Sequence, residues 1–230
     1  MGYPDLQQLN VEWPPYFGNL SVLVSGMTPT QWVPYLRYSV INRYSVIMSA
    51  AFANETFNFY GKFLYGQQEP PARWKFCISE TDSAVGELLG AYFAEVSFGA
   101  VSKKVAQEMV LAIESAMTAD LKTVSWMDET TRNLALDKMS KMANLVGYPD
   151  NPRNYSDLPV AANQFFTNYV NSEMNAFDRA METVGQPSDR YQWEMTADTI
   201  NAYYDPTRNE MVFPAGILQS PYFNVSWPLV

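Results

Sequence analysis

The chain has 230 residues, of which 47% are hydrophobic and 17% charged, and this balance excludes an intrinsically disordered protein. Its 24 acidic and 15 basic residues give a formal charge of −9, and no basic stripe occurs, which excludes binding to a nucleic-acid backbone. The best candidate for a membrane segment, residues 40–52, is interrupted by Asn42 and Arg43, and the first residues lack the basic start and apolar stretch of a signal peptide.

The first third of the chain predicts helices separated by proline and glycine. Residues 1–29 form an irregular opening with one short helix over about 16–24. A longer helix begins near Thr30, with Thr28 or Thr30 as its cap, and its apolar residues recur at helical spacing: Trp32, Tyr35, Leu36, Val40 and Ile47. Another helix covers about 54–64 and ends at Gly66, before Pro70 and Pro71 break the chain.

The middle of the chain continues the helical pattern. One long helix is predicted over 73–98, and residues 105–124 show the clearest helical period in the sequence. Ser125-Trp126-Met127-Asp128 is typical of an N-terminal cap box and predicts a helix that stops at Gly147-Tyr148-Pro149. A further helix is predicted over about 163–184.

The character of the sequence changes near its C-terminus. Thr199–Tyr204 and Met211–Pro214 are short and rich in β-branched or aromatic residues, and a turn at Asp205–Asn209 separates them. This pattern predicts a β-hairpin. The fold class is therefore mainly α, with some six helices followed by a short hairpin.

Most kinds of catalytic site are excluded by the side chains present. The sequence has no histidine and one cysteine, so it can form neither a Ser-His-Asp nor a Cys-His arrangement, nor a His- or Cys-rich zinc site. The segment from Gly86 to Gly90 lacks the Lys-Ser/Thr that a phosphate-binding loop requires, so Gly86 and Gly90 are expected to permit close helix packing. The acidic pairs Glu80 with Asp82 and Asp128 with Glu129 are interpreted as helix-start residues that complement the helix dipole.

The hairpin has two interpretations on its residues alone. It is either an ordinary paired hairpin or an open strand edge that continues its hydrogen-bond ladder into an extended peptide. Asn201 carries an amide that can both donate to and accept from a peptide bond.

Cys77 and four N-x-[ST] sequons are relevant to whether the protein enters the secretory pathway. A lone cysteine such as Cys77 is most often a small buried hydrophobe, although an unpaired one can also have lost its partner. The sequons favour a secretory route weakly, and their asparagines are Asn19, Asn54, Asn154 and Asn224.

Several motifs resemble one known family in the same order along the chain. They are residues 201–219 (NAYYDPTRNEMVFPAGILQ), and before them Asn58-Phe59-Tyr60-Gly61 with Gly66, Arg73-Trp74-Lys75-Phe76-Cys77, residues 126–132 (WMDETTR), residues 146–150 (VGYPD), and Trp193-Glu194-Met195-Thr196. Together they resemble the neprilysin and endothelin-converting-enzyme family of zinc metalloendopeptidases across about residues 30–223. After Phe223 the sequence no longer follows the family.

The resemblance implies a two-lobed, mostly helical ectodomain around a cavity that admits short peptides. Residues 1–196 would be the later part of its helical N-terminal domain, and residues 197–230 a truncated start of its catalytic domain. The family binds zinc through two histidines of H-E-x-x-H and a downstream glutamate, with the glutamate of the motif as general base. In relatives these residues lie beyond the position of Val230, so no catalytic or metal residue is assigned in this chain.

The resemblance assigns three substrate-binding residues. Asn201 would hold the peptide backbone through its side chain, Ala202 would pair with it through its main chain, and Tyr222, where relatives usually have Phe, would border the pocket beside the scissile bond. The complete enzyme would need zinc and cleave short peptides on the amino side of hydrophobic residues. Cys77 stands where relatives have a cysteine bonded to one far upstream. The location implied is extracellular or an ectodomain.

Three hypotheses follow for the chain itself. It is part of an active zinc metalloendopeptidase, and inactive alone, or it is a catalytically dead protein that binds peptides or a full-length relative. The third hypothesis is a helical module with a scaffolding role. An in-frame H-E-x-x-H within about a hundred codons downstream of codon 223 would favour the first hypothesis.

Overall fold

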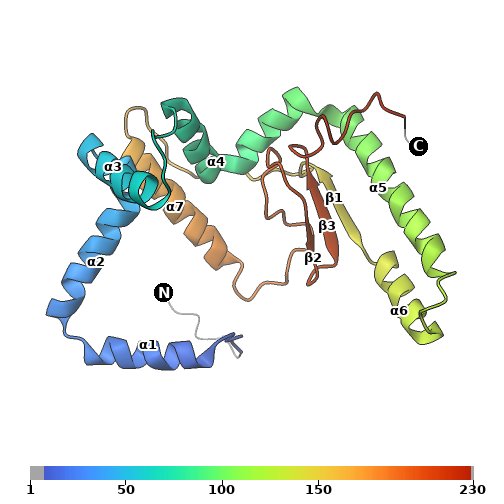
Figure 1. Cartoon of the computed structure of the whole chain (residues 1–230), viewed down its shortest axis with the longest axis horizontal. Helices are drawn as coiled ribbons and strands as arrows, with labels where there is room; N and C mark the ends of the chain where they lie inside the picture. The colour runs from blue at the N-terminus through green and yellow to red at the C-terminus, as the bar shows by residue number, and fades with distance from the viewer. Residues whose placement is uncertain (1–7, 229–230) are drawn as a thin grey trace. The chain divides into compact units, whose positions relative to one another are not determined.

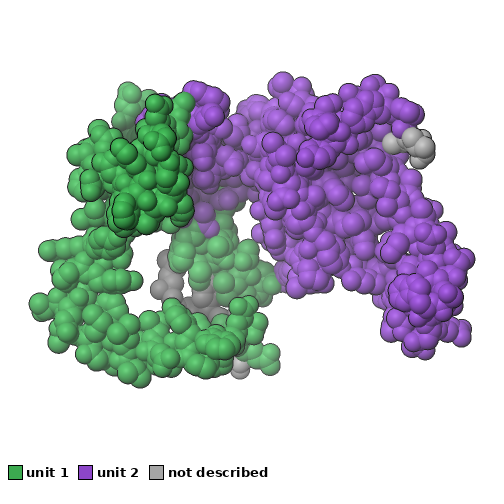
Figure 2. Space-filling model, in the orientation of Figure 1, with its two compact units in different colours: residues 1–72, 160–171, 177–186 green, residues 73–159, 172–176, 187–230 purple. Residues whose placement is uncertain are grey.

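The computed structural model describes residues 8–228 and is mainly helical, as predicted (Figure 1). The chain divides into two compact units, which Figure 2 distinguishes by colour. The first unit comprises residues 1–72, 160–171 and 177–186, and the second comprises residues 73–159, 172–176 and 187–230.

Prolines and one threonine set the helix starts of the first unit. α1 (Pro14–Gly26) and α2 (Pro29–Tyr44) both begin with proline, whose missing N–H costs nothing in the first helical turn. Thr28 caps α2, and its amide donates to the side chain of Gln31 at 2.9 Å, which confirms the cap predicted there. The ring of Tyr44 at the end of α2 packs edge-on against Phe166 and Tyr169 of α7 (Phe165–Glu182).

The helix predicted over 54–64 is longer and irregular. After a 3₁₀ turn η1 (Ser45–Ile47), α3 (Ala50–Thr56) continues into η2 (Phe57–Leu64), whose hydrogen bonds follow the wider π-helical pattern. The segment ends at Gly66, which has a φ of +68° and so adopts the left-handed conformation that favours glycine.

The second unit begins with two long helices. α4 (Arg73–Ser97) has one non-helical residue, Val85, and α5 (Gly99–Leu121) starts after a 93° bend. None of the described helices alone is long and apolar enough to cross a membrane, and only the bent pair α4 and α5 meets length and composition criteria together. α6 (Glu129–Ser140) is capped by Asp128, whose carboxylate accepts from the amide of Thr131 at 2.8 Å.

Two expectations for this region were wrong. The cap is Asp128 alone, because the helix begins at Glu129 and Ser125 lies outside its first turn. The helix predicted to run as far as Gly147 ends at Ser140, and Ala143–Gly147 form the strand β1 instead. These residues leave the helical pattern because they pair with a strand far along the sequence.

The sheet has the strand order β1-β3-β2. β2 (Tyr203–Asp205) and β3 (Glu210–Pro214) form the predicted antiparallel hairpin, with Tyr203 opposite Val212. β1 runs parallel to β3, with Ala143 opposite Glu210 and Gly147 opposite Pro214. Both β1 and β2 are therefore edge strands of the sheet in the part of the chain that is described.

A buried cluster joins the helices of the second unit to the sheet and to the segment after it. Its members come from α4, α5 and the residue between them, from β1 and from residues 215–223: Ala94, Phe98, Ala106, Val110, Val146, Ala215, Leu218 and Phe223. The hydrophobic effect on these side chains holds α5 against β1 and fixes the chain that follows β3.

Candidate functional site

The turn of the hairpin is held by one arginine among three carboxylates. Arg208 lies 3.1 Å from Glu194, 3.2 Å from Glu210 and 3.4 Å from Asp205, and its side chain is only 16% exposed. Asp205 also accepts from the amide and the hydroxyl of Thr207, both at 2.7 Å, which with its other contacts lowers the pKa of Asp205. The charged network fixes the turn that joins the two strands.

Glu210 is the most unusual member of this network, because its residue is fully buried. Burial raises the pKa of Glu210, although the hydrogen bond and the charge of Arg208 act in the opposite direction. Sequence reasoning missed this pair: the two charges are visible in the turn, but nothing in the sequence shows that one of them is buried.

Asn201 and Ala202 lie immediately before the edge strand β2. Asn201 is exposed and Ala202 is partly buried. The side-chain oxygen of Asn201 accepts from the amide of Ala202 at 2.8 Å. The two residues predicted to bind a peptide are thus next to each other, at an edge whose hydrogen-bonding groups are not paired with another described strand.

Close approach to α4 positions the segment that leads into this edge. A Cβ atom on Gly90 would lie 2.9 Å from the main-chain nitrogen of Ala197, and one on Gly86 would lie 2.5 Å from Thr196. Gly90 and Gly86 therefore permit close packing, as predicted, but the partner is an irregular segment and not another helix. The amide of Gly216 donates to Ala197 at 2.8 Å and ties the same segment to the chain after β3.

Two other expectations about α4 were wrong. Glu80 and Asp82 lie inside α4 and not at its start, so they do not have the predicted role at a helix terminus. Burial followed by the charge of Asp198 raises the pKa of Asp82. Cys77 is exposed, contrary to the expectation of a buried thiol, because it lies on the solvent side of this helix.

Tyr222 is separate from the pair at the edge strand. It is 72% exposed, whereas its neighbour Phe223 is buried and lies 6.1 Å from Phe98 between ring centroids. Within residues 8–228 no hydrogen bond or ring contact joins Tyr222 to Asn201 or Ala202. Asn201 and Ala202 are neighbours in the sequence, and within residues 8–228 the structure shows no contact that brings the third predicted residue to them.

The side chains do not fit the zinc ion that the resemblance implies. The sequence contains no histidine, and its one cysteine is exposed. In the described part of the chain no three carboxylate or thiol groups are close enough together to hold a metal ion. A zinc site needs three or four such ligands in tetrahedral geometry, so no reaction step is assigned to zinc here.

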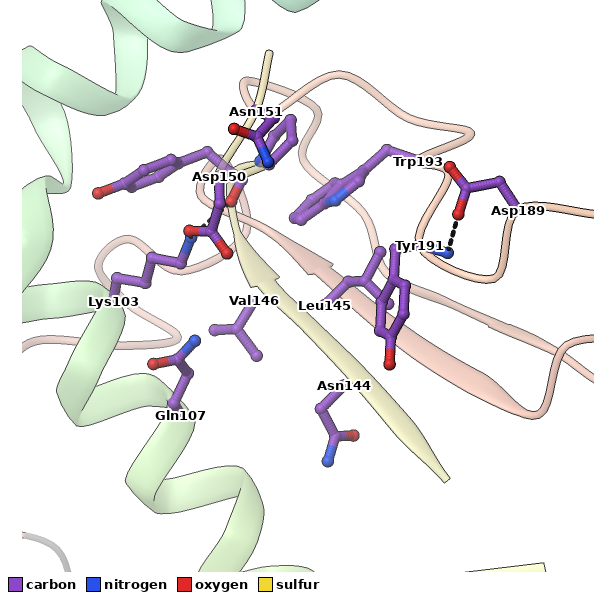
Figure 3. A pocket seen from close by; sticks show the side chains of 12 residues that line it. Lys103, Gln107, Asn144, Leu145, Val146, Asp150, Asn151, Asp189, Tyr191 and Trp193 are labelled. Carbon is purple, nitrogen blue, oxygen red and sulfur yellow. Dashed lines mark hydrogen bonds and ion pairs between the residues drawn. The ribbon is translucent and has the colours of Figure 1, made fainter. Parts of the chain in front are cut away.

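A cavity of about 410 Å³ lies beside β1 in the second unit (Figure 3). Its walls come from α5, from β1 and the residues after it, and from the loop before β2, and include Lys103, Gln107, Asn144, Asp150, Tyr191 and Trp193. The Lys103 ammonium is 2.6 Å from the Asp150 carboxylate and donates to the Tyr148 carbonyl at 2.7 Å. Sequence reasoning missed this cavity because it depends on the strand β1.

Comparison with known proteins gives a consistent match. One sequence model described as Peptidase family M13 matches residues 2–149, and a second with the same description matches residues 201–230. The second match extends past Phe223, so the expectation that the similarity ends there was wrong. Neprilysin-3 of Drosophila melanogaster is 30% identical over 94% of this chain, and endothelin-converting enzyme 1 of Homo sapiens is 32% identical over 93%. The chain spans 29% of the length of each of these relatives.

Solved structures agree with the sequence match. The zinc metalloprotease ZMP1 of Mycobacterium tuberculosis in complex with an inhibitor is 32% identical, with a TM-score of 0.83, over 92% of this chain and 32% of that one. PepO from Lactobacillus rhamnosis is 27% identical, with a TM-score of 0.78, over 90% of this chain and 34% of that one. The chain therefore belongs to peptidase family M13, the metallopeptidase family that includes neprilysin and endothelin-converting enzyme.

Proposed function

We propose that the chain is the part of an M13 zinc metalloendopeptidase that binds the backbone of short peptide substrates. Residues 1–196 are the later part of the helical N-terminal domain, and residues 197–230 are the start of the catalytic domain. This division is supported by the two family models, the first of which ends at residue 149 and the second of which begins at residue 201.

The observation that carries the proposal is the position of Asn201 and Ala202 at the edge of the sheet. β2 is paired with β3 on one side only, so an extended peptide can add to its other side. The side-chain amide of Asn201 can donate to one peptide group and accept from another. Ala202 offers its main-chain carbonyl, because its N–H already donates to the side chain of Asn201. Tyr222 is an exposed aromatic residue, and by the resemblance it would border the pocket beside the scissile bond.

Peptide hydrolysis requires groups that this chain does not hold. With no histidine and no suitable carboxylate cluster in its described part, the chain alone is inactive. In the complete family enzyme a bound zinc ion would supply Lewis-acid chemistry, and no residue of this chain is assigned to hold it. Short peptides are the partners, and the proposed location is extracellular or an ectodomain, which the four sequons favour.

The alternative is a non-catalytic protein that binds peptides or acts as a helical scaffold. A catalytically dead peptide-binding protein would use the same edge and would bind peptides without any zinc-bearing partner. A scaffold would show no dependence on Asn201 in any setting. The dependence of peptide cleavage on Asn201 distinguishes the scaffold from the peptide-binding proteins.

A hybrid enzyme tests the proposal. Residues 197–223 of this chain would replace the matching stretch of endothelin-converting enzyme 1, and peptide cleavage would be measured with and without Asn201→Ala. We expect kcat/KM to fall by about one to two orders of magnitude, because the bound peptide loses hydrogen bonds to the amide. Pro206→Ala, in the exposed hairpin turn, is the control. A hybrid in which Asn201→Ala changes melting temperature strongly and kinetics not at all would refute the substrate-binding role.

A further inference from the structure

Within residues 8–228 the outer edge of β1 carries main-chain groups that no other strand pairs. The amide of Ala143 donates to Asn209 at 3.0 Å, and the carbonyl of Gly147 accepts from Ala215 at 2.7 Å, so these residues direct their main-chain groups toward β3. Successive residues of a strand direct their groups to opposite edges, so Asn144 and Val146 direct theirs away from β3. The carbonyl of Val146 accepts from Tyr148 at 3.1 Å. The N–H of Val146 and both main-chain groups of Asn144 therefore face the outer edge.

The cavity of about 410 Å³ lies along this edge. Figure 3 shows Asn144 and Val146 on the side of the strand where Gln107 and Lys103 of α5 lie, and Leu145 beside Tyr191 on the other side. Three consecutive residues of β1 line the cavity although their side chains alternate, as expected of a groove that follows a strand edge. Its volume is within the range of sites that hold small ligands, so it can take a short stretch of peptide.

The charges that line the groove favour a basic guest. The side chain of Lys103 is only 12% exposed and is already bonded to Asp150 and Tyr148, whereas the side chain of Asp150 is 87% exposed. Asp189 adds a second exposed carboxylate. One ammonium and two carboxylates leave an excess of one negative charge. The rings of Tyr191 and Trp193 on the same wall can stabilise a cation by cation–π contact.

The side chain of Asn144 also lacks a partner. Its amide oxygen is buried and accepts no hydrogen bond from any residue in the described range. A buried carbonyl oxygen is normally paired, so this atom is suited to a donor from a molecule in the groove.

We propose that this groove is a second peptide-binding site, in which an extended peptide with a basic side chain adds to β1 as a fourth strand. The guest bonds through its main chain to Asn144 and Val146, and its basic side chain lies against the ring of Trp193, which Figure 3 shows between Asp150 and Asp189. This site is at the opposite edge of the sheet from Asn201 and Ala202 and does not depend on their role.

The direct test uses the full 230-residue chain and a fluorescein-labelled peptide amide of sequence Ser-Thr-Val-Arg-Val-Thr, with binding followed by fluorescence anisotropy. Two versions of the peptide carry N-methyl groups on alternate amides. In the first version the methyl groups are on one edge of the extended peptide, and in the second version they are on the opposite edge. We expect one version to bind at least tenfold more weakly and the other to stay within about twofold, because only one edge of a guest strand can bond to β1. Equal affinity of both versions would overturn the proposal, and modification of the peptide leaves protein folding unaffected.

Hydrogen exchange and variants locate the site. Peptide should slow exchange at the amides of Asn144 and Val146, and replacement of its Arg by Glu should weaken binding at least tenfold. Asp189→Asn and Trp193→Ala should each weaken binding severalfold, whereas Asp137→Asn, on α6 outside the groove, should not. Protection confined to β2, or self-association of the chain through β1 in sedimentation, would show a different occupant and refute the proposal.

Discussion

The side-chain oxygen of Asn201 accepts a hydrogen bond from the main-chain amide of Ala202 at 2.8 Å. An aspartate at this position can keep that bond, because its carboxylate also accepts, but it cannot donate to a substrate carbonyl. In the hybrid enzyme we therefore expect Asn201→Asp to lower kcat/KM at least tenfold while the melting temperature changes by less than about 2 °C.

Asn201→Ala provides the comparison, because it removes both the internal bond and the donor. If Asn201→Asp kept full activity and Asn201→Ala lost it, the internal bond to Ala202 would be the important one. Asn201 would then have a structural role, and substrate binding through its side chain would be wrong.

Gly90 is expected to be intolerant of any side chain. The Cβ atom of an alanine would lie 2.9 Å from the main-chain nitrogen of Ala197, so Gly90→Ala must displace the segment before β2. We expect a loss of about 1–3 kcal/mol in the free energy of unfolding, measured by urea denaturation. The control is Gly18→Ala in α1, where nothing lies within 4 Å and alanine should be neutral or stabilising. Equal effects of the two substitutions would contradict the close packing described for α4.

Breaking the Arg208–Glu210 pair should destabilise the fold, because Glu210 is buried. Arg208→Met leaves the buried carboxylate of Glu210 without its cation, which should cost about 3–5 kcal/mol in the free energy of unfolding. Arg208→Met combined with Glu210→Gln should cost much less, because no buried charge remains. Equal losses in the single and double variants would show that Arg208 acts by packing alone.

The same pair predicts a pH dependence. Because burial raises the pKa of Glu210 above its ordinary value of 4.5, the folded state binds the proton more tightly than the unfolded state. Glu210 therefore lowers stability above its folded pKa, and stability recovers as the pH falls toward 4.5. In thermal unfolding between pH 4.5 and 7.5, the melting temperature of the wild type should fall as the pH rises, and that of Glu210→Gln should fall less. Parallel curves for the two proteins would contradict it.

The sequence predicted the helices well because their apolar spacing and their caps are local features. The proline starts of α1 and α2, the Thr28 cap and the hairpin turn at Asp205–Asn209 all depend on neighbouring residues. β1 was missed because Met139 and Met142 continue a helical spacing, and because the ladder of Ala143 with Glu210 joins residues far apart in the chain. A short apolar run cannot be assigned to helix or strand by its periodicity.

The candidate site was predictable only in part. Asn201 and Ala202 came from the resemblance, and the structure places them together before β2. The burial of Glu210 and the groove beside β1 depend on tertiary packing, which no local pattern encodes. The exposure of Cys77 has the same origin, because an apolar sequence context does not say which side of α4 is covered.

Cys77 should be fully accessible to reagents in the folded protein. Because the thiol is exposed, we expect one equivalent of maleimide to react to completion without denaturant, and Cys77→Ser to abolish the reaction. Mass spectrometry of the intact chain measures the addition. A thiol that reacts only after unfolding would contradict the exposed position of Cys77.

We propose that this chain holds a peptide-binding edge of an M13 metallopeptidase and no zinc centre of its own. The most direct measurement incubates the pure 230-residue chain with zinc and an internally quenched peptide that contains hydrophobic residues, with and without a chelator. We expect no cleavage above that in buffer and no effect of the chelator, because the sequence has no histidine and the described part has no suitable cluster of ligands. Zinc-dependent cleavage that the chelator stops would contradict it.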